Sequence, residues 1–328
     1  MLDISAVSGV PNGRYVLTDH RSPRPFNQVL ITGAPASGKT SMLCIIAAVK
    51  DAVGPYPGAV MDRRRLIAKG DHQGRVTAIW WISERERDFT GLEEPLQPCN
   101  LTIGSDSIQV DTDDRLRRLF AYYAQDAGHG KFEYFPHGRR LTSPGWKGPS
   151  LAVSGAATGR LRLAGDPDKY IGLREVLRNL VLAGAARIAQ VLDTQGIALR
   201  TDVPDPLASY RDAMALLLPD LRLATVEPQD KGALVWFLRR DGARVELDDL
   251  SASEQQAVLF ASAFVRLGLC RSVILIDTPE LFIHPRRQAA FFAGLAQLGE
   301  DNQIIAATSS PELLAAVRPE QVIDLDQA

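Results

Sequence analysis

Gly33-Ala34-Pro35-Ala36-Ser37-Gly38-Lys39-Thr40 is a glycine-bracketed loop that joins two apolar segments of the chain. An apolar strand over 29–31 leads into the loop, and an apolar helix over 39–49 follows it. In a loop of the pattern G-x-x-x-x-G-K-T, backbone N–H groups turn inward around a phosphate chain, the lysine meets the terminal phosphates, and the hydroxyl binds Mg²⁺. A chance Gly/Ser turn is the alternative. Because the strand leads directly into the loop and the helix begins directly after it, the stretch predicts a nucleotide site.

The positive end of the helix dipole adds to this phosphate site. We therefore expect the nucleotide contacts to come from one short run of residues, namely Gly33, Pro35, Ala36, Ser37, Gly38, Lys39, Thr40 and Ser41. Within that run, Lys39 is also expected to act on the reacting phosphate, and Thr40 to bind the metal ion.

The composition is that of an ordinary globular protein. The chain has 328 residues, of which 45% are hydrophobic and 23% charged, so it could form one large domain or two small ones. The net charge of −2 hides local basic clusters at 63–65, 117–118, 139–140 and 286–287. Such clusters are usually solvated surface, and they form a track for nucleic-acid phosphates only where several share one face.

Cysteine usage and hydropathy point to the cytoplasm. Cys44, Cys99 and Cys270 have neither C-x-x-C spacing nor an even count, which predicts reduced thiols rather than disulfides or a metal site. Asp3, among other polar residues, interrupts any signal-like run near the N-terminus. No apolar run approaches the roughly 18 residues of a membrane span, so no contact with a membrane is expected.

Secondary structure in the first half is predicted from periodicity and turn residues. We expect a first strand at 15–17, whose Tyr15 is a candidate for stacking on the adenine base, although half-buried strand tyrosines are common. Two further predictions are an antiparallel pair formed by 65–68 and 76–82, and a helix over 111–124. Residues 83–109 have no clear pattern, and the Gly- and Pro-rich stretch 128–165 reads as a long loop whose order depends on a partner or on the nucleotide.

The second half reads first as helices, then a hairpin, then alternating strands and helices. Helices are expected at 172–192 and 206–217, and a hairpin at 234–247 around the turn Asp241-Gly242. After these we expect helix 251–267, strand 272–276, helix 286–298, strand 303–307, helix 311–317 and strand 321–325. Such alternation predicts an α/β fold with a mainly parallel sheet flanked by helices. We divide the chain into an N-terminal lobe (1–110), an inserted helical subdomain (111–230) and a C-terminal lobe (231–328) of one composite domain, with an antiparallel β subdomain beside the parallel sheet.

Asp277 is the second candidate site residue. It ends the apolar strand over 272–276, and in a P-loop sheet an aspartate in this place, the Walker B position, completes the Mg²⁺ shell together with Thr40. A strand-ending aspartate by itself often only caps a turn. Its combination with the phosphate loop predicts the metal ligands Thr40 and Asp277.

A third candidate is the segment Leu250-Ser251-Ala252-Ser253-Glu254-Gln255-Gln256. Ser251 and Glu254 have the spacing of a capping box, in which the hydroxyl accepts from the N3 amide and the glutamate reaches back to the N-cap. A helix N-terminus with free N–H groups and serine hydroxyls also suits a γ-phosphate presented by a second subunit. Both interpretations can hold for Ser251, Ser253 and Glu254.

The order of these motifs resembles the ABC-type ATPases of the SMC, RecF and OLD group, and most of all the stand-alone ATPases beside effector proteins in bacterial defence modules. The motifs are the phosphate loop, Leu-Ser-x-x-Glu-Gln-Gln, Ile-Asp-x-Pro-Glu-Leu-x-x-His-Pro over 276–285, and the strand end over 307–312. The resemblance covers 26–50 and 230–328 well, and the middle only by layout. It implies ATP and Mg²⁺ as ligands, and a head-to-tail homodimer that places Ser251 and Ser253 against the partner's γ-phosphate.

The chain departs from this family at two catalytic positions. Thr278 stands where relatives usually carry a glutamate that activates water, and Ser309 stands where a histidine senses the γ-phosphate. Losing a positioned acid-base group costs about 10²–10⁴-fold in rate, so slow hydrolysis or ATP binding as a switch follows as a hypothesis. Glu280 could approach the water, but relatives have a glutamate there as well. Ala252 and Ser253 replace a glycine that is frequent in relatives, which restricts close backbone approach.

The leading functional hypothesis is an ATP-gated dimer that works with a separate effector or with nucleic acid. The chain ends soon after the last expected strand, which leaves no room for an appended nuclease domain. The alternatives are a scaffold that binds ATP without turnover, the motor subunit of a membrane transporter, and a small-molecule P-loop kinase. The long insertion over about 110–230 argues against the transporter, and the segment over 250–256 argues against the kinase.

Overall fold

A five-stranded, wholly parallel sheet forms the centre of the computed structural model, which describes residues 1–7, 9–19, 24–56, 73–104, 107–122, 131–141, 172–195, 205–230 and 232–327. The strand order is β13-β3-β12-β11-β7. The strands are β3 (Gln28–Thr32), β7 (Phe132–Phe135), β11 (Val273–Asp277), β12 (Gln303–Ala307) and β13 (Val322–Asp324). The predicted α/β fold with a parallel sheet is confirmed. Because β12 pairs with both β3 and β11, the carboxyl ends of these three strands meet at one edge.

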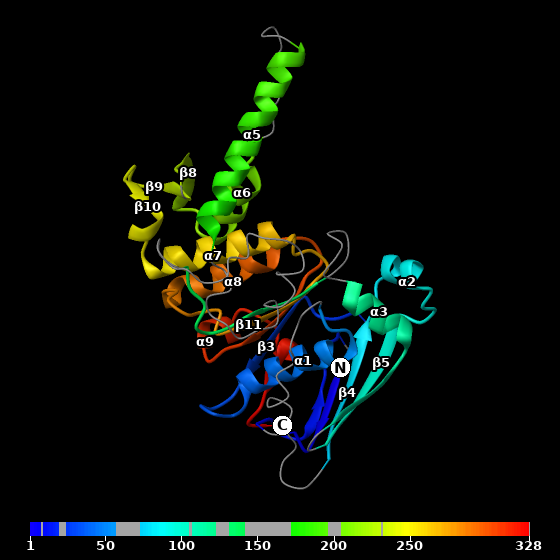
Figure 1. The fold of residues 1–328 in the computed structure, drawn as a ribbon. Coiled ribbons are helices and arrows are strands. Elements are labelled where there is room, and N and C mark those ends of the chain that lie inside the picture. Colours follow the sequence, from blue (N-terminus) through cyan, green and yellow to red (C-terminus); the bar gives the residue numbers. More distant parts are fainter. Residues whose placement is uncertain are drawn as a thin grey trace.

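Each strand of this sheet divides its side chains between two cores. In β3, Val29 and Ile31 enter the first core and Leu30 enters the second. In β11, Leu275 lies in the first core and Ile276 in the second, as the two-residue period of a strand requires. Helix α1 (Lys39–Val53) covers the first face, and α7 (Ala252–Leu267) and α8 (Pro285–Gln297) cover the second (Figure 1). The short helix α9 (Pro311–Leu314) follows β12.

An antiparallel sheet with the order β2-β1-β4-β5-β6 makes up the N-terminal lobe. Its strands are β1 (Leu2–Ser5), β2 (Gly13–Tyr15), β4 (Gly74–Trp81), β5 (Leu96–Ile103) and β6 (Ile108–Thr112), with the helices α2 (Glu84–Thr90) and α3 (Asp114–Tyr122) at one end. The alternating burial of β5 places Cys99 and Leu101 inside and Asn100 outside. This sheet and α3 close the first core against α1.

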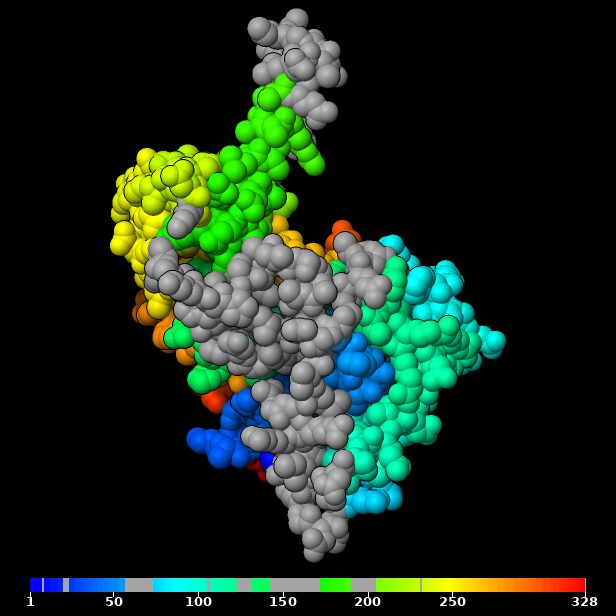
Figure 2. All heavy atoms as spheres, viewed as in Figure 1, coloured from blue at the N-terminus to red at the C-terminus, as the bar shows by residue number. Residues whose placement is uncertain are grey.

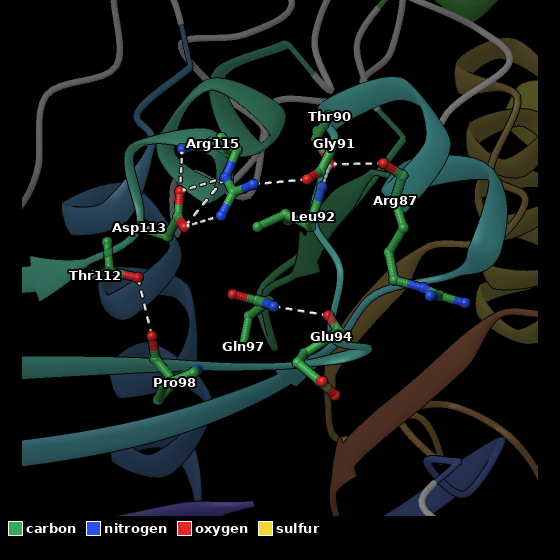
Figure 3. A network of polar contacts seen from close by, with 10 residues as sticks. All are labelled: Arg87, Thr90, Gly91, Leu92, Glu94, Gln97, Pro98, Thr112, Asp113 and Arg115. Atoms are coloured by element: carbon green, nitrogen blue, oxygen red, sulfur yellow. Dashed lines mark hydrogen bonds and ion pairs between the residues drawn. The ribbon is translucent and has the colours of Figure 1, made fainter.

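Arg115 ties the two helices of the N-terminal lobe together (Figure 3). Its Nη1 donates to the carbonyl of Gly91, 2.6 Å away, where the C-terminus of α2 turns through a left-handed φ of 74°. The same guanidinium holds the Asp113 carboxylate through Nη2 at 2.8 Å. The Thr112 hydroxyl donates to the carbonyl of Pro98 at 3.0 Å and so fastens β6 to β5. The beginning of α3 is thus held by α2 and by the sheet.

Helix α5 (Leu173–Gln195) projects from the body of the molecule, and α6 (Ala208–Leu217) lies beside its base (Figures 1 and 2). A second antiparallel sheet, in the order β10-β9-β8, adjoins this base. It consists of β8 (Leu221–Pro228), β9 (Ala233–Arg239) and β10 (Arg244–Glu246). Arg174 of α5 donates to the Glu246 carboxylate at 2.6 Å and to the Ala233 carbonyl at 2.8 Å. The two helices and the hairpin were predicted correctly, whereas β8 was not predicted.

Several predictions in the first 165 residues are wrong. The first strand is β1, and Tyr15 only ends β2. Strand β4 pairs with β1 and β5, and its predicted partner 65–68 lies outside the described residues. Residues 111–112 belong to β6, so helix α3 begins later than expected. The predicted loop over 128–165 contains β7, which pairs with β11 inside the central sheet.

Candidate functional site

The phosphate loop lies between β3 and α1, as predicted. Ala36 and Gly38 have left-handed φ values of 65° and 102°, which turn the backbone around the loop. A Cβ added to Gly38 would lie 2.0 Å from the carbonyl oxygen of Gly9, so only glycine fits there. The Lys39 ammonium donates to the carbonyls of Gly33 and Ala34, each at 2.8 Å. The lysine side chain therefore folds back over the start of the loop.

The end of the chain contacts this loop. The Asp326 carboxylate, just after β13, accepts a hydrogen bond from the backbone N–H of Ala34 at 2.6 Å. Backbone Leu325 N–H also donates to the carbonyl of Thr32 at 3.0 Å. The start of the phosphate loop is held from the side of β13.

Thr40 and Asp277 meet at the edge of the sheet. The Thr40 hydroxyl donates to Asp277 Oδ2 at 2.9 Å, although the two residues lie far apart in sequence. Burial raises the pKa of the Asp277 carboxyl above its usual range, while the Thr40 hydroxyl and the nearby charges of His137, Arg139 and Lys39 act in the opposite direction. Two oxygen ligands of the kind that Mg²⁺ prefers thus adjoin the first turn of α1.

Thr278, Glu280 and Ser309 lie beside this pair. Thr278 has a φ of 50°, which is strained for a β-branched residue, and its hydroxyl donates to the Asp277 carbonyl at 2.8 Å. The backbone N–H of Ser309, after β12, donates to Glu280 Oε1 at 3.1 Å. The structure thus places the residues of the phosphate loop, Asp277, Thr278, Glu280 and Ser309 along one edge of the sheet.

Two buried polar atoms of this group lack a hydrogen-bond partner among the described residues. They are the Ser37 hydroxyl and Glu280 Oε2. A buried polar atom without a partner costs about 1–3 kcal/mol, so each is suited to a ligand that supplies one. The hydroxyl can donate to a phosphate oxygen, and the carboxylate oxygen can accept from water.

Ser251, Ser253 and Glu254 are not part of this group. They begin α7, which covers the opposite face of the sheet from α1, and within the described part of the chain none of them is hydrogen-bonded to the phosphate loop. The predicted capping box is present, because Ser251 Oγ accepts from the Glu254 N–H and the Glu254 carboxylate accepts from the Ser251 N–H at 2.8 Å.

Arg239 pairs with the capping glutamate. Its Nε and Nη2 each lie 2.8 Å from a carboxylate oxygen of Glu254, and this pair, with help from Ser251, lowers the pKa of Glu254 from 4.5 to about 2. Because the pKa of Glu254 is lower in the folded than in the unfolded protein, its carboxylate stabilises the fold at every pH above the unfolded pKa. This contribution is lost as pH falls toward about 2.

We expect Glu254→Gln to reduce this acid sensitivity. Glutamine keeps the capping geometry but cannot titrate, so the midpoint of thermal unfolding should fall less steeply between about pH 5 and pH 3 than in the wild type. Thermal unfolding across this pH range measures the difference. Parallel pH profiles of the two proteins would show that the Arg239–Glu254 pair does not stabilise the fold.

Tyr15 does not form a base-stacking platform. Its side chain is 3% exposed, and its hydroxyl donates to the Pro11 carbonyl at 2.8 Å. The ring packs in the first core, so the prediction of an adenine contact is wrong for this conformation.

The turn after β7 is the part of the site that the sequence did not predict. Residues 136–139 form a turn in which the Arg139 N–H donates to the Pro136 carbonyl at 3.3 Å. Arg139 is 1% exposed and bonds to the carbonyls of Asp277 and Thr278. The only sequence signal was the four-residue aromatic run 132–135, which is too short to identify a strand within a Gly- and Pro-rich stretch. Arg139 of the cluster 139–140 is therefore not available to a surface track for nucleic-acid phosphates.

Comparisons with known proteins agree with this arrangement. The family described as "AAA domain, putative AbiEii toxin, Type IV TA system" matches residues 159–315. A solved SMC head bound to the C-terminal winged-helix domain of ScpA has a TM-score of 0.50 at 16% identity, covering 98% of this chain and 95% of that one. An SMC head with an extended coiled coil, bound to the C-terminal domain of ScpA derived from Pyrococcus furiosus, has 0.50 at 13%, covering 96% and 90%. The SMC head of Thermotoga maritima has 0.46 at 12%, covering 96% and 92%.

No curated protein matches the chain in sequence. The structural matches show the fold alone, and this fold is similar to that of the SMC head, as the resemblance of the motifs implied. The matched AAA family model covers less than half of the chain. Within the residues that the structure covers, no helix has both the length and the apolar character of a membrane span.

Proposed function

We propose that the protein binds ATP with Mg²⁺ and that ATP closes a homodimer, which acts as a switch on a separate partner. The hydrogen bond of 2.9 Å between Thr40 and Asp277 carries this proposal, because it joins the phosphate loop and the end of β11 in the geometry of a shared metal ligand set. The proposal includes one composite ATPase domain with the lobes 1–110, 111–230 and 231–328, in which β6 and α3 pack with the first lobe.

The residues present fit both ligands. Thr40 and Asp277 would hold Mg²⁺, which neutralises phosphate charge when bound, and the Ser37 hydroxyl is a free donor for a phosphate oxygen. Lys39 can exchange its two loop carbonyls for the terminal phosphates by rotation of its side chain. Gly33, Pro35, Ala36, Gly38 and Ser41 complete the loop and the first turn of α1.

Slow ATP hydrolysis follows from the residues that would adjoin the attacking water. Thr278 cannot act as a base near neutral pH, and Ser309 supplies a backbone N–H to Glu280 rather than an imidazole. Glu280 Oε2 can still accept from a water molecule. A state that persists for long after ATP binds is what a switch requires. A scaffold that never hydrolyses ATP is the second candidate, favoured by the same two residues.

The proposed dimer is an ATP sandwich in which Ser251, Ser253 and Glu254 of each subunit face the nucleotide of the other. Their place on the face of the sheet opposite α1 supports contact in trans rather than within one chain. A cytoplasmic location is part of the proposal, because the three cysteines have neither C-x-x-C spacing nor an even count. An effector protein is the proposed partner, and nucleic acid is a second one. The toxin–antitoxin wording of the matched family supports a role in bacterial defence.

Phe282 is expected to lie in the dimer interface. It follows Glu280 in the loop between β11 and α8, it is 59% exposed, and its φ of 65° is strained. An exposed aromatic side chain next to the nucleotide edge suits contact with the partner, where aromatic residues are frequent anchors. We expect Phe282→Asp to weaken ATP-dependent dimerisation by at least about tenfold.

Analytical ultracentrifugation with ATP and Mg²⁺ measures this effect. Phe89→Asp is the matched control, because Phe89 is 51% exposed but lies on α2, in the N-terminal lobe. Equal weakening by both substitutions would remove Phe282 from the interface.

The proposed function is tested by light scattering with and without ATP and Mg²⁺, together with phosphate release. Dimerisation by ATP with little phosphate released supports the switch. A wild type that binds ATP but remains monomeric would remove the trans role of Ser251 and Ser253. Dimerisation without any phosphate release over many hours would favour the non-hydrolysing scaffold.

A further inference from the structure

Arg139 is the largest fully buried side chain in the described part of the molecule. Its guanidinium donates from Nη1 to the Asp277 carbonyl at 2.7 Å and from Nη2 to the Thr278 carbonyl at 2.9 Å. Its Nε donates to Gln256 Oε1 of α7 at 2.9 Å. One side chain thus joins the turn after β7, the end of β11 and helix α7.

The peptide that Arg139 holds is strained. Thr278 is β-branched and has a left-handed φ of 50°, a conformation that persists only where the surroundings over-determine it. Two hydrogen bonds from a buried cation to the successive carbonyls of Asp277 and Thr278 are such a constraint, since charge-assisted bonds are stronger than neutral ones. The Thr278 N–H, which donates to the Ala307 carbonyl at 2.9 Å, completes it.

The link to α7 has two parts. Gln256 is 3% exposed and presents its amide oxygen to Arg139, and the guanidinium also lies 4.8 Å from the ring centre of Phe260, one helical turn further on. Gln256 lies in the second turn of α7, directly after the capping box of Ser251 and Glu254. The N-terminal half of α7 is therefore joined directly to the guanidinium of Arg139.

We propose that Arg139 is a positioning residue that holds the Asp277–Thr278 peptide in place and couples it through Gln256 to the N-terminus of α7. The proposal rests on the proposed function in one respect, namely that this N-terminus contacts the partner's nucleotide. Contact of α7 with the nucleotide of the other subunit then adjusts the Asp277–Thr278 peptide at the subunit's own nucleotide. The two sites of the dimer are thereby coupled.

The test uses Gln256→Leu in the full chain, because removing the buried Arg139 could prevent folding. Leucine has a similar volume, removes the acceptor and leaves the three hydrogen bonds of Arg139 to backbone carbonyls intact. Gln256→Glu is the conservative variant, since it keeps an acceptor oxygen. Gln255→Leu is the matched control, because the neighbouring Gln255 bonds to the Leu250 carbonyl and not to Arg139.

Amide hydrogen exchange of the nucleotide-free protein is the first readout. We expect Gln256→Leu to raise exchange over residues 273–283 by about tenfold, with α1 unchanged, and Gln256→Glu and Gln255→Leu to match the wild type. Equal exchange over 273–283 in the two leucine variants would overturn the proposal. So would a rise that extends over α1 as well, because it would indicate a general loss of stability.

Nucleotide coupling is the second readout. Gln256→Leu is expected to bind ATP at low protein concentration within about twofold of the wild type but to need about tenfold more protein to dimerise. An equal loss of binding and dimerisation would contradict a coupling role. If wild type itself fails to bind ATP, the proposed function fails, whereas the exchange measurement still tests the link between Arg139 and α7.

Discussion

Replacing Thr278 with glutamate is expected to raise the rate of phosphate release from ATP by about 10²- to 10⁴-fold, the range that a positioned general base contributes. Residue 278 directly follows Asp277 in the sequence. It lies at the edge of the sheet where the phosphate loop and Glu280 also lie. A carboxylate there can orient the attacking water and accept its proton. The left-handed backbone is also less strained for glutamate than for a β-branched threonine.

Thr278→Gln is the control for this substitution. Glutamine has the shape of glutamate and can orient water, but it cannot accept a proton. Phosphate release by Thr278→Gln should therefore stay near the wild-type rate, measured at saturating ATP with a coupled assay. Equal rates for the glutamate and glutamine variants would show that proton acceptance at residue 278 does not limit hydrolysis, and a glutamate variant no faster than the wild type would show that residue 278 does not limit it at all.

Lys39→Ala is expected to weaken ATP binding by about 10- to 100-fold, because a hydrogen bond to a charged group contributes roughly 1.5–3 kcal/mol and each 1.4 kcal/mol is a factor of ten. Lys39 also bridges the carbonyls of Gly33 and Ala34, so its loss loosens the loop that surrounds the phosphates. ATP-dependent dimerisation should be lost together with binding at micromolar nucleotide.

Equilibrium titration with a fluorescent ATP analogue measures the affinity, and thermal unfolding verifies that the variant is folded. Lys39→Arg keeps the charge, and we expect it to retain part of the affinity. Undiminished binding by Lys39→Ala would remove the phosphate loop from the proposed site.

The parts of the fold that the sequence predicted are those with a local signal. The phosphate loop has glycines at fixed spacing, β11 is an apolar run that ends in Asp277, and the capping box of α7 requires only Ser251 and Glu254. Each of these patterns is determined within a few residues. The alternation of strands and helices predicted the parallel sheet, and the phosphate loop together with Asp277 predicted that Thr40 and Asp277 lie close together.

The parts that were missed depend on partners distant in sequence. Strand β7 consists of four residues, all of them buried, and only its pairing with β11 makes it a strand. Arg139 belongs to an Arg-Arg pair that composition assigns to the surface, yet it is buried because three carbonyls and Gln256 surround it. Tyr15 has the size and polarity of a base-stacking residue, and only the packing around it shows that its ring is inaccessible.

The hydrogen bond from Ala34 to Asp326 has a consequence for how the protein is made. Strand β13, which ends two residues before Asp326, adds the outer edge to β3 directly beside the phosphate loop. During translation, the phosphate loop with Ala34 leaves the ribosome long before β13 and Asp326. A nascent chain therefore cannot complete its nucleotide loop in this conformation until the segment with β13 and Asp326 has left the ribosome, because Ala34 lacks this hydrogen-bond partner until then.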